Sequence, residues 1–255
     1  MINTIRQEMA QKFIEQMMEI FIEPEMQRRQ SVGLISKGFV LNGVQIIFYP
    51  DGRQPAVRLN DEVRAIANIK LKEGIAKRAQ EPIYRHEIEE YGHMALVDSS
   101  DADCGHATIV RINEASWTLS FDFVYNKAMS KAHLERAESF LKSAELNLQN
   151  ENWPPLVDHL FDACELIARA ILLGMPDPKF RENATHDGIQ FKFNQFARFG
   201  NVRGDDTKAL NKLSGMATSA RYMKGGVLNI SRQEANEFIA TIREMKRDAE
   251  NRIAR

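Results

Sequence analysis

The sequence is poor in the residues that mark several specialised classes of protein. Only two cysteines, Cys104 and Cys164, occur among 255 residues, and they show no ligand-like spacing. Two unpatterned thiols are typical of a reducing compartment, with a single disulfide as the alternative. No uncharged run approaches the length of a membrane span, and Arg6, Glu8 and Lys12 interrupt any signal-peptide pattern. We therefore expect a soluble cytoplasmic protein.

The chain also lacks a large excess of one charge. Its 34 lysines and arginines nearly balance 35 aspartates and glutamates, so the formal net charge is −1. The second half of the chain is only slightly basic. A nucleic-acid site would therefore be a local cluster rather than a broad basic surface. Hydrophobic residues make up 44 % of the chain, which is enough to bury a core.

Motifs for several common enzyme chemistries are missing. The sequence contains no Gly-rich phosphate loop, no nucleophile elbow and no paired-carboxylate motif. One loop gathers residues that bind metals elsewhere, namely Asp98, Asp101, Asp103, Cys104 and His106. Aspartate and serine are also the usual residues of hairpin loops. We predict no cofactor and no bound metal.

The first 126 residues have the pattern of an α+β domain. In residues 2–22 apolar side chains recur every three or four positions, which predicts an amphipathic helix that ends near Pro24. Asn42-Gly43 between two β-rich runs predicts a hairpin. Residues 61–80 are interpreted as a strand followed by a helix. Three strands of an antiparallel meander are predicted at residues 93–97, 107–112 and 117–125.

At Asn126 the hydrophobic period changes from two residues to 3.6 without a flexible linker. We therefore predict two domains that pack together, an α+β domain over 1–126 and an all-α domain over 127–255. Five helices are predicted at about 128–149, 153–173, 187–199, 206–224 and from Ser231 onward. Ser231 and Glu234 form the pattern of a capping box. Short connections between such helices favour an antiparallel bundle.

Three segments of the helical half resemble the HEPN family. The first is the helix pair KAHLERAESFLKSAELNLQNENWPPLVDHLFDACELIARAIL, and the second is ATHDGIQFKFNQF, similar to the family's Thr-His-x-Gly segment. The third is SARYMKGGVLNISRQEANEFI, similar to the family's Ala-Asp-Tyr stretch, serine cap and final helix. The resemblance covers about the last half of the chain. The first 125 residues resemble no family.

The resemblance implies two kinds of function. Many family members are metal-independent endoribonucleases of toxin, antiphage or RNA-processing systems, with an Arg-x(4–6)-His motif at a dimer interface. Others bind nucleotides or partner a small nucleotidyltransferase. Our leading hypothesis is a homodimeric nucleotide- or RNA-binding protein of a prokaryotic defence, stress or toxin–antitoxin system, with a nucleotidyltransferase or an antitoxin as partner. The alternatives are an endoribonuclease and a dimeric protein-interaction module whose N-terminal domain recognises the partner.

An Arg-x(4)-His motif occurs at Arg181 and His186, with Asn183 between them. Arginine can stabilise the charge that develops on a phosphate, and histidine can carry the proton between the 2′-hydroxyl and the leaving oxygen. Asn183 could orient either group. In the family's ribonucleases the motif normally sits later, near residues 216–223 of this chain, where no histidine occurs. The alternative is structural: His186 caps or packs the start of a helix and Arg181 pairs with a carboxylate.

A second set of residues forms the predicted nucleotide- or RNA-binding surface. Its members are basic or aromatic: Arg198, Arg203, Lys208, Lys212, Arg221 and Tyr222. The first four follow one another over 15 positions and form the best local anion-binding patch. The alternative is an ordinary solvated helix face and loop.

Overall fold

The computed structural model describes residues 2–113, 116–182, 185–222 and 228–254. The chain divides into two compact units, Met1–Phe123 and Val124–Arg255. The division falls where the hydrophobic period changes in the sequence. Each unit has its own hydrophobic core. That the two domains pack together stays a prediction.

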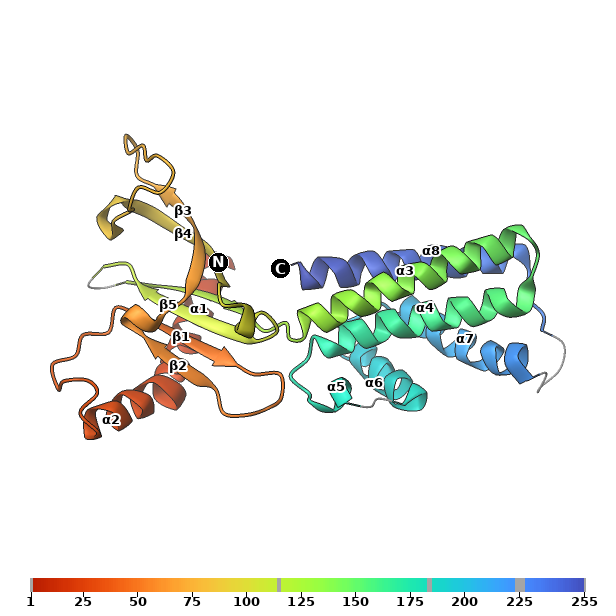
Figure 1. Cartoon of the computed structure of the whole chain (residues 1–255), viewed down its shortest axis with the longest axis horizontal. Coiled ribbons are helices and arrows are strands. Elements are labelled where there is room, and N and C mark those ends of the chain that lie inside the picture. Colours follow the sequence, from red (N-terminus) through yellow and green to blue (C-terminus); the bar gives the residue numbers. More distant parts are fainter. Residues whose placement is uncertain (1, 114–115, 183–184, 223–227, 255) are drawn as a thin grey trace. The chain divides into compact units, whose positions relative to one another are not determined.

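The N-terminal unit combines two helices with six strands (Figure 1). Its elements are α1 (Ile2–Met17), a π-helical turn (Met18–Ile22), α2 (Glu23–Ser31), β1 (Gly43–Phe48), β2 (Ala56–Leu59), β3 (Ala65–Leu71), β4 (Ile88–Leu96), β5 (Gly105–Arg111) and β6 (Trp117–Asp122). Four antiparallel strands form one sheet in the order β2-β1-β5-β6, and β3 pairs with β4 in a separate two-stranded sheet. The predicted α+β class is confirmed.

One face of the four-stranded sheet packs against the N-terminal helices. Val44, Ile46 and Ile109 project from β1 and β5 into this core and are almost fully buried, as is Ile22 of the π-helical turn. Alternate residues of the same strands face the other way and include Gln45, which is fully buried and hydrogen-bonded to Thr108 at 3.3 Å. The period of two therefore separates an apolar face from one that carries polar side chains together with the fully buried Ile47.

Four local predictions for this unit are wrong. The first helical segment does not end near Pro24, because α2 continues it to Ser31. Asn42-Gly43 is not a hairpin turn, because Gly43 already pairs with Val110 of β5 and the Asn42 carbonyl accepts a hydrogen bond from the Arg111 amide at 2.8 Å. Residues 72–80 contain no helix, and the strand β3 lies just before them. The meander also fails, because β4 pairs with β3 and not with β5. The β5–β6 hairpin is confirmed.

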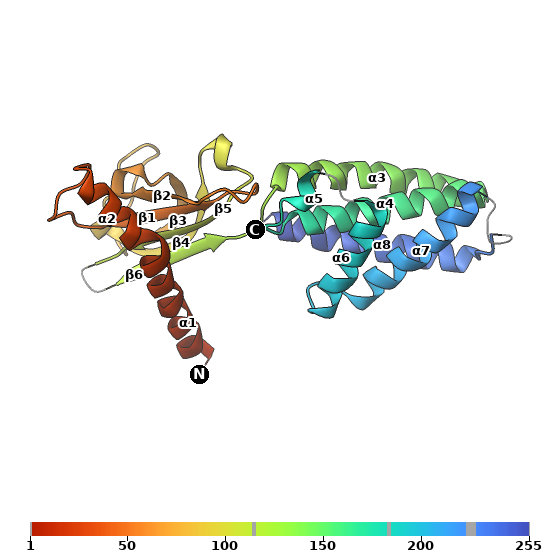
Figure 2. The ribbon, with the colours of Figure 1, turned by 90° about the horizontal axis from the view of Figure 1, so that it is seen from below.

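The C-terminal unit is the predicted helical bundle. Its elements are α3 (Lys127–Gln149), α4 (Trp153–Leu173), a short α5 (Lys179–Glu182), α6 (His186–Arg198), α7 (Gly204–Tyr222) and α8 (Arg232–Ile253). The long helices α3, α4 and α8 lie side by side in both views (Figures 1 and 2). All five predicted helices are confirmed, with their described ends within a few residues of the expected ones, and α5 was not predicted. The expected end of the fourth helix, at residue 224, lies outside the described residues.

Helix α4 lies at the centre of this bundle, where it contacts α3, α6, α7 and α8. Leu156, Leu160 and Ile167 lie on one side of α4 and are fully buried. Helix α8 begins as predicted, because the Ser231 hydroxyl accepts a hydrogen bond from the Glu234 amide at 3.1 Å. The Glu234 side chain forms an ion pair with α7.

None of the helices in the described part of the chain is long and apolar enough to cross a membrane.

Candidate functional site

His186 occupies the first position of α6 and lies on the surface of α4. The cap of α6 is Thr185, whose hydroxyl accepts a hydrogen bond from the Gly188 amide at 3.1 Å, so His186 is not the capping residue. The His186 side chain is 69 % exposed, and its Nδ1 lies 2.5 Å from Oε2 of Glu165. Its ring centroid is 6.0 Å from that of Phe161. The imidazole is therefore fixed on one side and open to solvent on the other.

Arg221, near the end of α7, contacts the same part of α4. Its guanidinium forms ion pairs with Asp158 and, at 2.9 Å, with Asp162. The guanidinium carbon lies 5.8 Å from the centre of the Phe161 ring. Burial lowers the pKa of Arg221, but the hydrogen bond that Arg221 donates to Asp158 and the two carboxylate charges raise it more, so its net pKa is raised. Arg221 thus carries a permanent charge at this surface.

The carboxylates that hold these two residues lie on one side of α4. Asp158, Asp162 and Glu165 are spaced by four and three residues, which places them along one face of a helix. Phe161 lies beside this row and is 6 % exposed. We call these four residues, together with His186 and Arg221, the α4 ledge.

The ledge has the parts of a proton-transfer site. When Nδ1 of a neutral histidine donates to a carboxylate, Nε2 becomes the acceptor, and this acceptor can take up a proton from a ligand. Glu165 holds the His186 ring in place and stabilises the imidazolium that such a transfer creates. Arg221 supplies a planar cation beside the same Phe161 ring, which suits a phosphate oxygen.

The structure does not join Arg181 to this ledge. Arg181 lies on α5 and is exposed, and its guanidinium forms no ion pair within the described residues. Asn183 lies outside the described residues. The predicted pairing of Arg181 with a nearby carboxylate is therefore not seen in the described part of the chain, and the contact that His186 does make is with α4. The catalytic roles of Arg181, Asn183 and His186 stay predictions.

The four residues of the predicted anion-binding patch do not form a free basic surface. Arg203 pairs with Asp206 at 2.6 Å and also with two carboxylates of α8. Lys208 pairs with Asp205 at 2.9 Å. Lys212 forms an ion pair with Glu234, the second residue of the α8 capping pattern. Arg198 is exposed at the end of α6 and has no ion pair within the described residues. Tyr222 ends α7.

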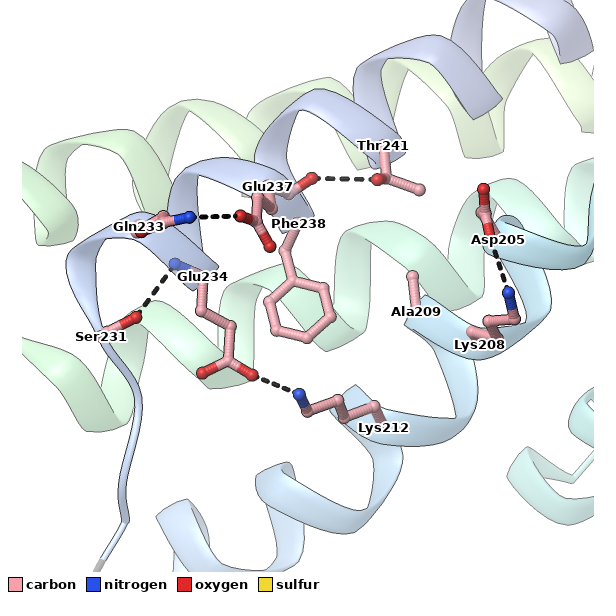
Figure 3. A pocket seen from close by; sticks show the side chains of 10 residues that line it. All are labelled: Asp205, Lys208, Ala209, Lys212, Ser231, Gln233, Glu234, Glu237, Phe238 and Thr241. Atoms are coloured by element: carbon pink, nitrogen blue, oxygen red, sulfur yellow. Dashed lines mark hydrogen bonds and ion pairs between the residues drawn. The ribbon is translucent and has the colours of Figure 1, made fainter.

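Lys208 and Lys212 line a groove of about 510 Å³ between α7 and α8 (Figure 3). Phe238 points into the space between the two helices and is 8 % exposed, and Lys212 Nζ lies 5.7 Å from the centre of its ring. The groove also contains three carboxylates: Asp205, Glu234 and Glu237. Its volume is in the range of ligand sites, but its lysines are outnumbered by acidic groups.

The predicted cations therefore divide among separate places. Lys208 and Lys212 face α8, whereas Arg221 contacts α4, so they project from different sides of α7. Arg203 pairs with α8 near Glu244 and Asp248. His186 and Arg221 both lie against α4, whereas the remaining predicted cations lie at other places on the helical unit.

The four residues that α4 contributes to the ledge were not predicted from the sequence. A signal was present, because acidic residues at 158, 162 and 165 form a stripe opposite the buried stripe of the same helix. Charged stripes are common on solvated helices, however, and this one has significance only once His186 and Arg221 are placed against it.

The acidic loop of the N-terminal unit has a structural explanation. Asp101 is 4 % exposed and accepts a hydrogen bond from Arg58 at 2.6 Å, and Arg58 also lies 3.5 Å from Asp98. Among the residues that the structure describes, no group of three or more His, Cys, Asp or Glu side chains is arranged to hold a metal ion. Both cysteines are free and buried.

Comparison with known proteins identifies a match in the helical unit only. A family model described as "HEPN domain" matches residues 130–252, and the N-terminal region has no family match. No curated protein matches the chain. The matched range extends from α3 into α8, so it contains the α4 ledge and the α7–α8 groove.

Proposed function

The C-terminal half of the chain is a HEPN domain, and from this premise we propose that the protein binds RNA or a nucleotide at the α4 ledge. One observation carries the proposal: His186 and Arg221 come from different helices and both contact the ring of Phe161. Histidine and arginine are the two side chains best suited to a phosphodiester, one for the proton and one for the charge.

The charges at the ledge indicate how such a ligand would be held. Three carboxylates surround Arg221 and His186, so a general attraction for polyanions is weak here. A guanidinium has more N–H donors than its bonds to Asp158 and Asp162 use. A phosphate oxygen can therefore bind the remaining donors of Arg221 while its neighbour binds His186. This mode gives specific hydrogen bonds and a shallow dependence on salt.

Binding is tested with a fluorescently labelled single-stranded RNA of about 20 nucleotides, with ATP and GTP as competitors. Arg221→Gln in the full chain should weaken binding by about tenfold, because hydrogen bonds to charged groups contribute roughly 1.5–3 kcal/mol. The matched control is Lys208→Gln with Lys212→Gln, which changes two cations of the same helix outside the ledge. Equal losses in both proteins would reject the ledge as the site. Competition by ATP or GTP would identify a nucleotide as the ligand.

A second function, metal-independent RNA cleavage, is favoured by the contact between His186 and Glu165. In this reaction His186 Nε2 removes the proton of a ribose 2′-hydroxyl. The resulting oxygen attacks the adjacent phosphorus, and the bond from phosphorus to the 5′-oxygen breaks to leave a 2′,3′-cyclic phosphate. The leaving 5′-oxygen takes a proton from water or from the His186 imidazolium. Arg221 lies where it can stabilise the phosphorane, and Arg181 is a second candidate for that role. General base catalysis of this kind contributes about 10²–10⁴ in rate.

Cleavage is tested with the same RNA in the presence of EDTA. We expect His186→Ala to abolish cleavage, and Arg181→Ala to lower it by about 10²-fold if Arg181 holds the phosphate. His86→Ala is the matched control, because His86 is also exposed but belongs to the N-terminal unit. Circular dichroism must show native helix content for each variant. If the wild type and His186→Ala behave alike, the cleavage hypothesis fails and binding alone remains.

The cellular context belongs to the same proposal. The HEPN match supports a homodimer in a prokaryotic defence, stress or toxin–antitoxin system, with a nucleotidyltransferase or an antitoxin as partner. Expression of the wild-type chain should slow growth in the toxin case, and His186→Ala should relieve it. Slow growth that is the same in both would contradict a toxin acting through this residue.

A further inference from the structure

The N-terminal unit carries a groove of about 430 Å³ that the HEPN match does not include. It runs between the N-terminal helical segment and the four-stranded sheet. Val44 and Ile109 of the sheet form its buried floor, and Trp117 of β6 forms part of its wall. Ile14 and Met18 close the opposite side. The interior of the groove is therefore apolar.

The rim of this groove is acidic. Glu15, Glu19 and Glu23 follow one another at intervals of four residues, and all three line the groove and are exposed. Glu15 accepts a hydrogen bond from Gln11 at 3.0 Å, and none of the three has an ion pair within the described residues. No lysine or arginine occurs between Lys12 and Arg28.

A π-helical turn shapes the rim. The Glu23 amide bonds to the Met18 carbonyl, five residues earlier, within the turn Met18–Ile22. Residues spaced by four drift around an α-helix, and the wider π-helical turn counters this drift, so Glu15, Glu19 and Glu23 all stay on the groove side. Such turns are rare and occur frequently at functional sites.

We propose that this groove binds a basic amphipathic helix of a partner protein. The occupant must be apolar where it enters the groove and cationic where it meets the rim. Four residues of helix span about 6 Å, so lysines or arginines at i, i+4 and i+8 of a docked helix match the spacing of the three glutamates. A large apolar side chain between them fills the floor against Val44 and Trp117. This is recognition of a helix in a groove.

The rim glutamates differ in their ion pairing from a glutamate close to them in the sequence. Elsewhere in the same helical segment Glu25 is held by Arg28 and Arg29, each at 2.7 Å. An internal partner is therefore available to a glutamate two residues after Glu23, whereas the three rim glutamates have no ion pair within the described residues. Unpaired carboxylates beside an apolar groove repel a second acidic chain and select a basic one.

The proposal is tested with a displayed library of random 14-residue peptides selected against the full chain. Enriched peptides should carry Lys or Arg at intervals of four around a large apolar residue. The triple variant E15Q/E19Q/E23Q should bind them about tenfold more weakly at low salt, since each exposed ion pair contributes a factor of roughly 1.5–5. The matched control is D61N/E73Q/E90Q, which removes three exposed carboxylates of the same unit outside the groove and should bind as the wild type does.

A second measurement locates the peptide. In a Trp153→Phe background Trp117 is the remaining tryptophan, so its fluorescence should shift when a selected peptide enters the groove. The proposal is overturned if no peptide is enriched or if the enriched peptides lack the basic pattern. It is also overturned if they bind E15Q/E19Q/E23Q and the control alike, or leave Trp117 unchanged. Binding of RNA to the α4 ledge does not depend on these residues.

Discussion

Nδ1 of His186 lies 2.5 Å from Oε2 of Glu165, although 21 residues separate the two in the sequence. The contact joins the first turn of α6 to the middle of α4. Glu165 is 16 % exposed and His186 is 69 % exposed, so the carboxylate is set back and the imidazole is presented to solvent. A histidine held in this way has a defined orientation before any ligand arrives, which lowers the entropic cost of placing a proton acceptor.

The first prediction concerns this positioning carboxylate. Glu165→Gln keeps the size of the side chain but removes the charge that stabilises the imidazolium. If His186 transfers a proton, kcat for RNA cleavage should fall by about 10²-fold while the affinity for RNA changes little. Single-turnover cleavage and equilibrium binding separate the two quantities. Glu165→Asp should recover part of kcat. A loss of affinity with no change in kcat would show that Glu165 acts in binding only.

The second prediction separates the basic patch that the sequence indicated from the ledge that the structure shows. We consider the triple variant Arg198→Gln, Lys208→Gln, Lys212→Gln, and leave Arg203 intact because its partner Asp206 is 4 % exposed at the side chain. Three free cations on single-stranded RNA would contribute about 2 to the slope of log K against log salt. Because two of these cations are already ion-paired, we expect the slope to change by less than about 1.

Titration of RNA affinity between low and high salt decides this point. Arg221→Gln serves as the comparison, since it alters one cation of the ledge. A slope that falls by about 2 in the triple variant would restore the patch as the main RNA contact.

Sequence reasoning succeeded where the pattern is local. The N-terminus of α4 is indicated by Pro154 after Trp153, and that of α8 by the Ser231 cap. Both helices begin within a residue of the expected position. Sequence reasoning failed where the residue that pairs with a given position is distant in the sequence. The pairing of β1 with β5 joins residues about 60 positions apart, and no local sequence signal around Asn42-Gly43 indicates this pairing.

The candidate site shows the same limit. His186 was singled out from its spacing to Arg181, but the residue that shares its surface is Arg221, 35 positions later. Only the fold brings α6 and the end of α7 to one side of α4. A motif within one stretch of chain could be read from the sequence, whereas a site assembled from three helices could not.

The third prediction concerns the acid stability of the N-terminal unit. The hydrogen bond from Arg28 lowers the pKa of Glu25 to about 2, with Arg29 adding to the effect and burial opposing it. Because the pKa is lowered in the folded state, this stabilisation is complete above the unfolded value of 4.5 and is lost as the pH falls towards 2. Glu25→Gln should therefore cost about 1 kcal/mol at pH 7, after allowing for solvent screening, and almost nothing near pH 2.

Urea unfolding followed by Trp117 fluorescence in a Trp153→Phe background measures this unit by itself. Glu23→Gln is the control, since Glu23 lies two residues away and has no ion pair within the described residues. A destabilisation by Glu25→Gln that is the same at pH 7 and pH 2 would rule out the ion pairs as its cause.

The last prediction is that the full chain forms a homodimer through α6. Phe191 is 67 % exposed and Phe199 is 72 % exposed, and their spacing of eight residues places both near one side of the helix. Large exposed aromatic side chains at both ends of one short helical segment favour an interface. His186 begins the same helix, so a dimer formed there brings the α4 ledges of two protomers towards each other.

Light scattering should give twice the monomer mass of 29.2 kDa. Phe191→Asp with Phe199→Asp should give the monomer and weaken RNA binding or cleavage with it, whereas Leu146→Asp, an equally polar change at a 59 % exposed site on α3, should do neither. A wild-type monomer at tens of micromolar would exclude the dimer.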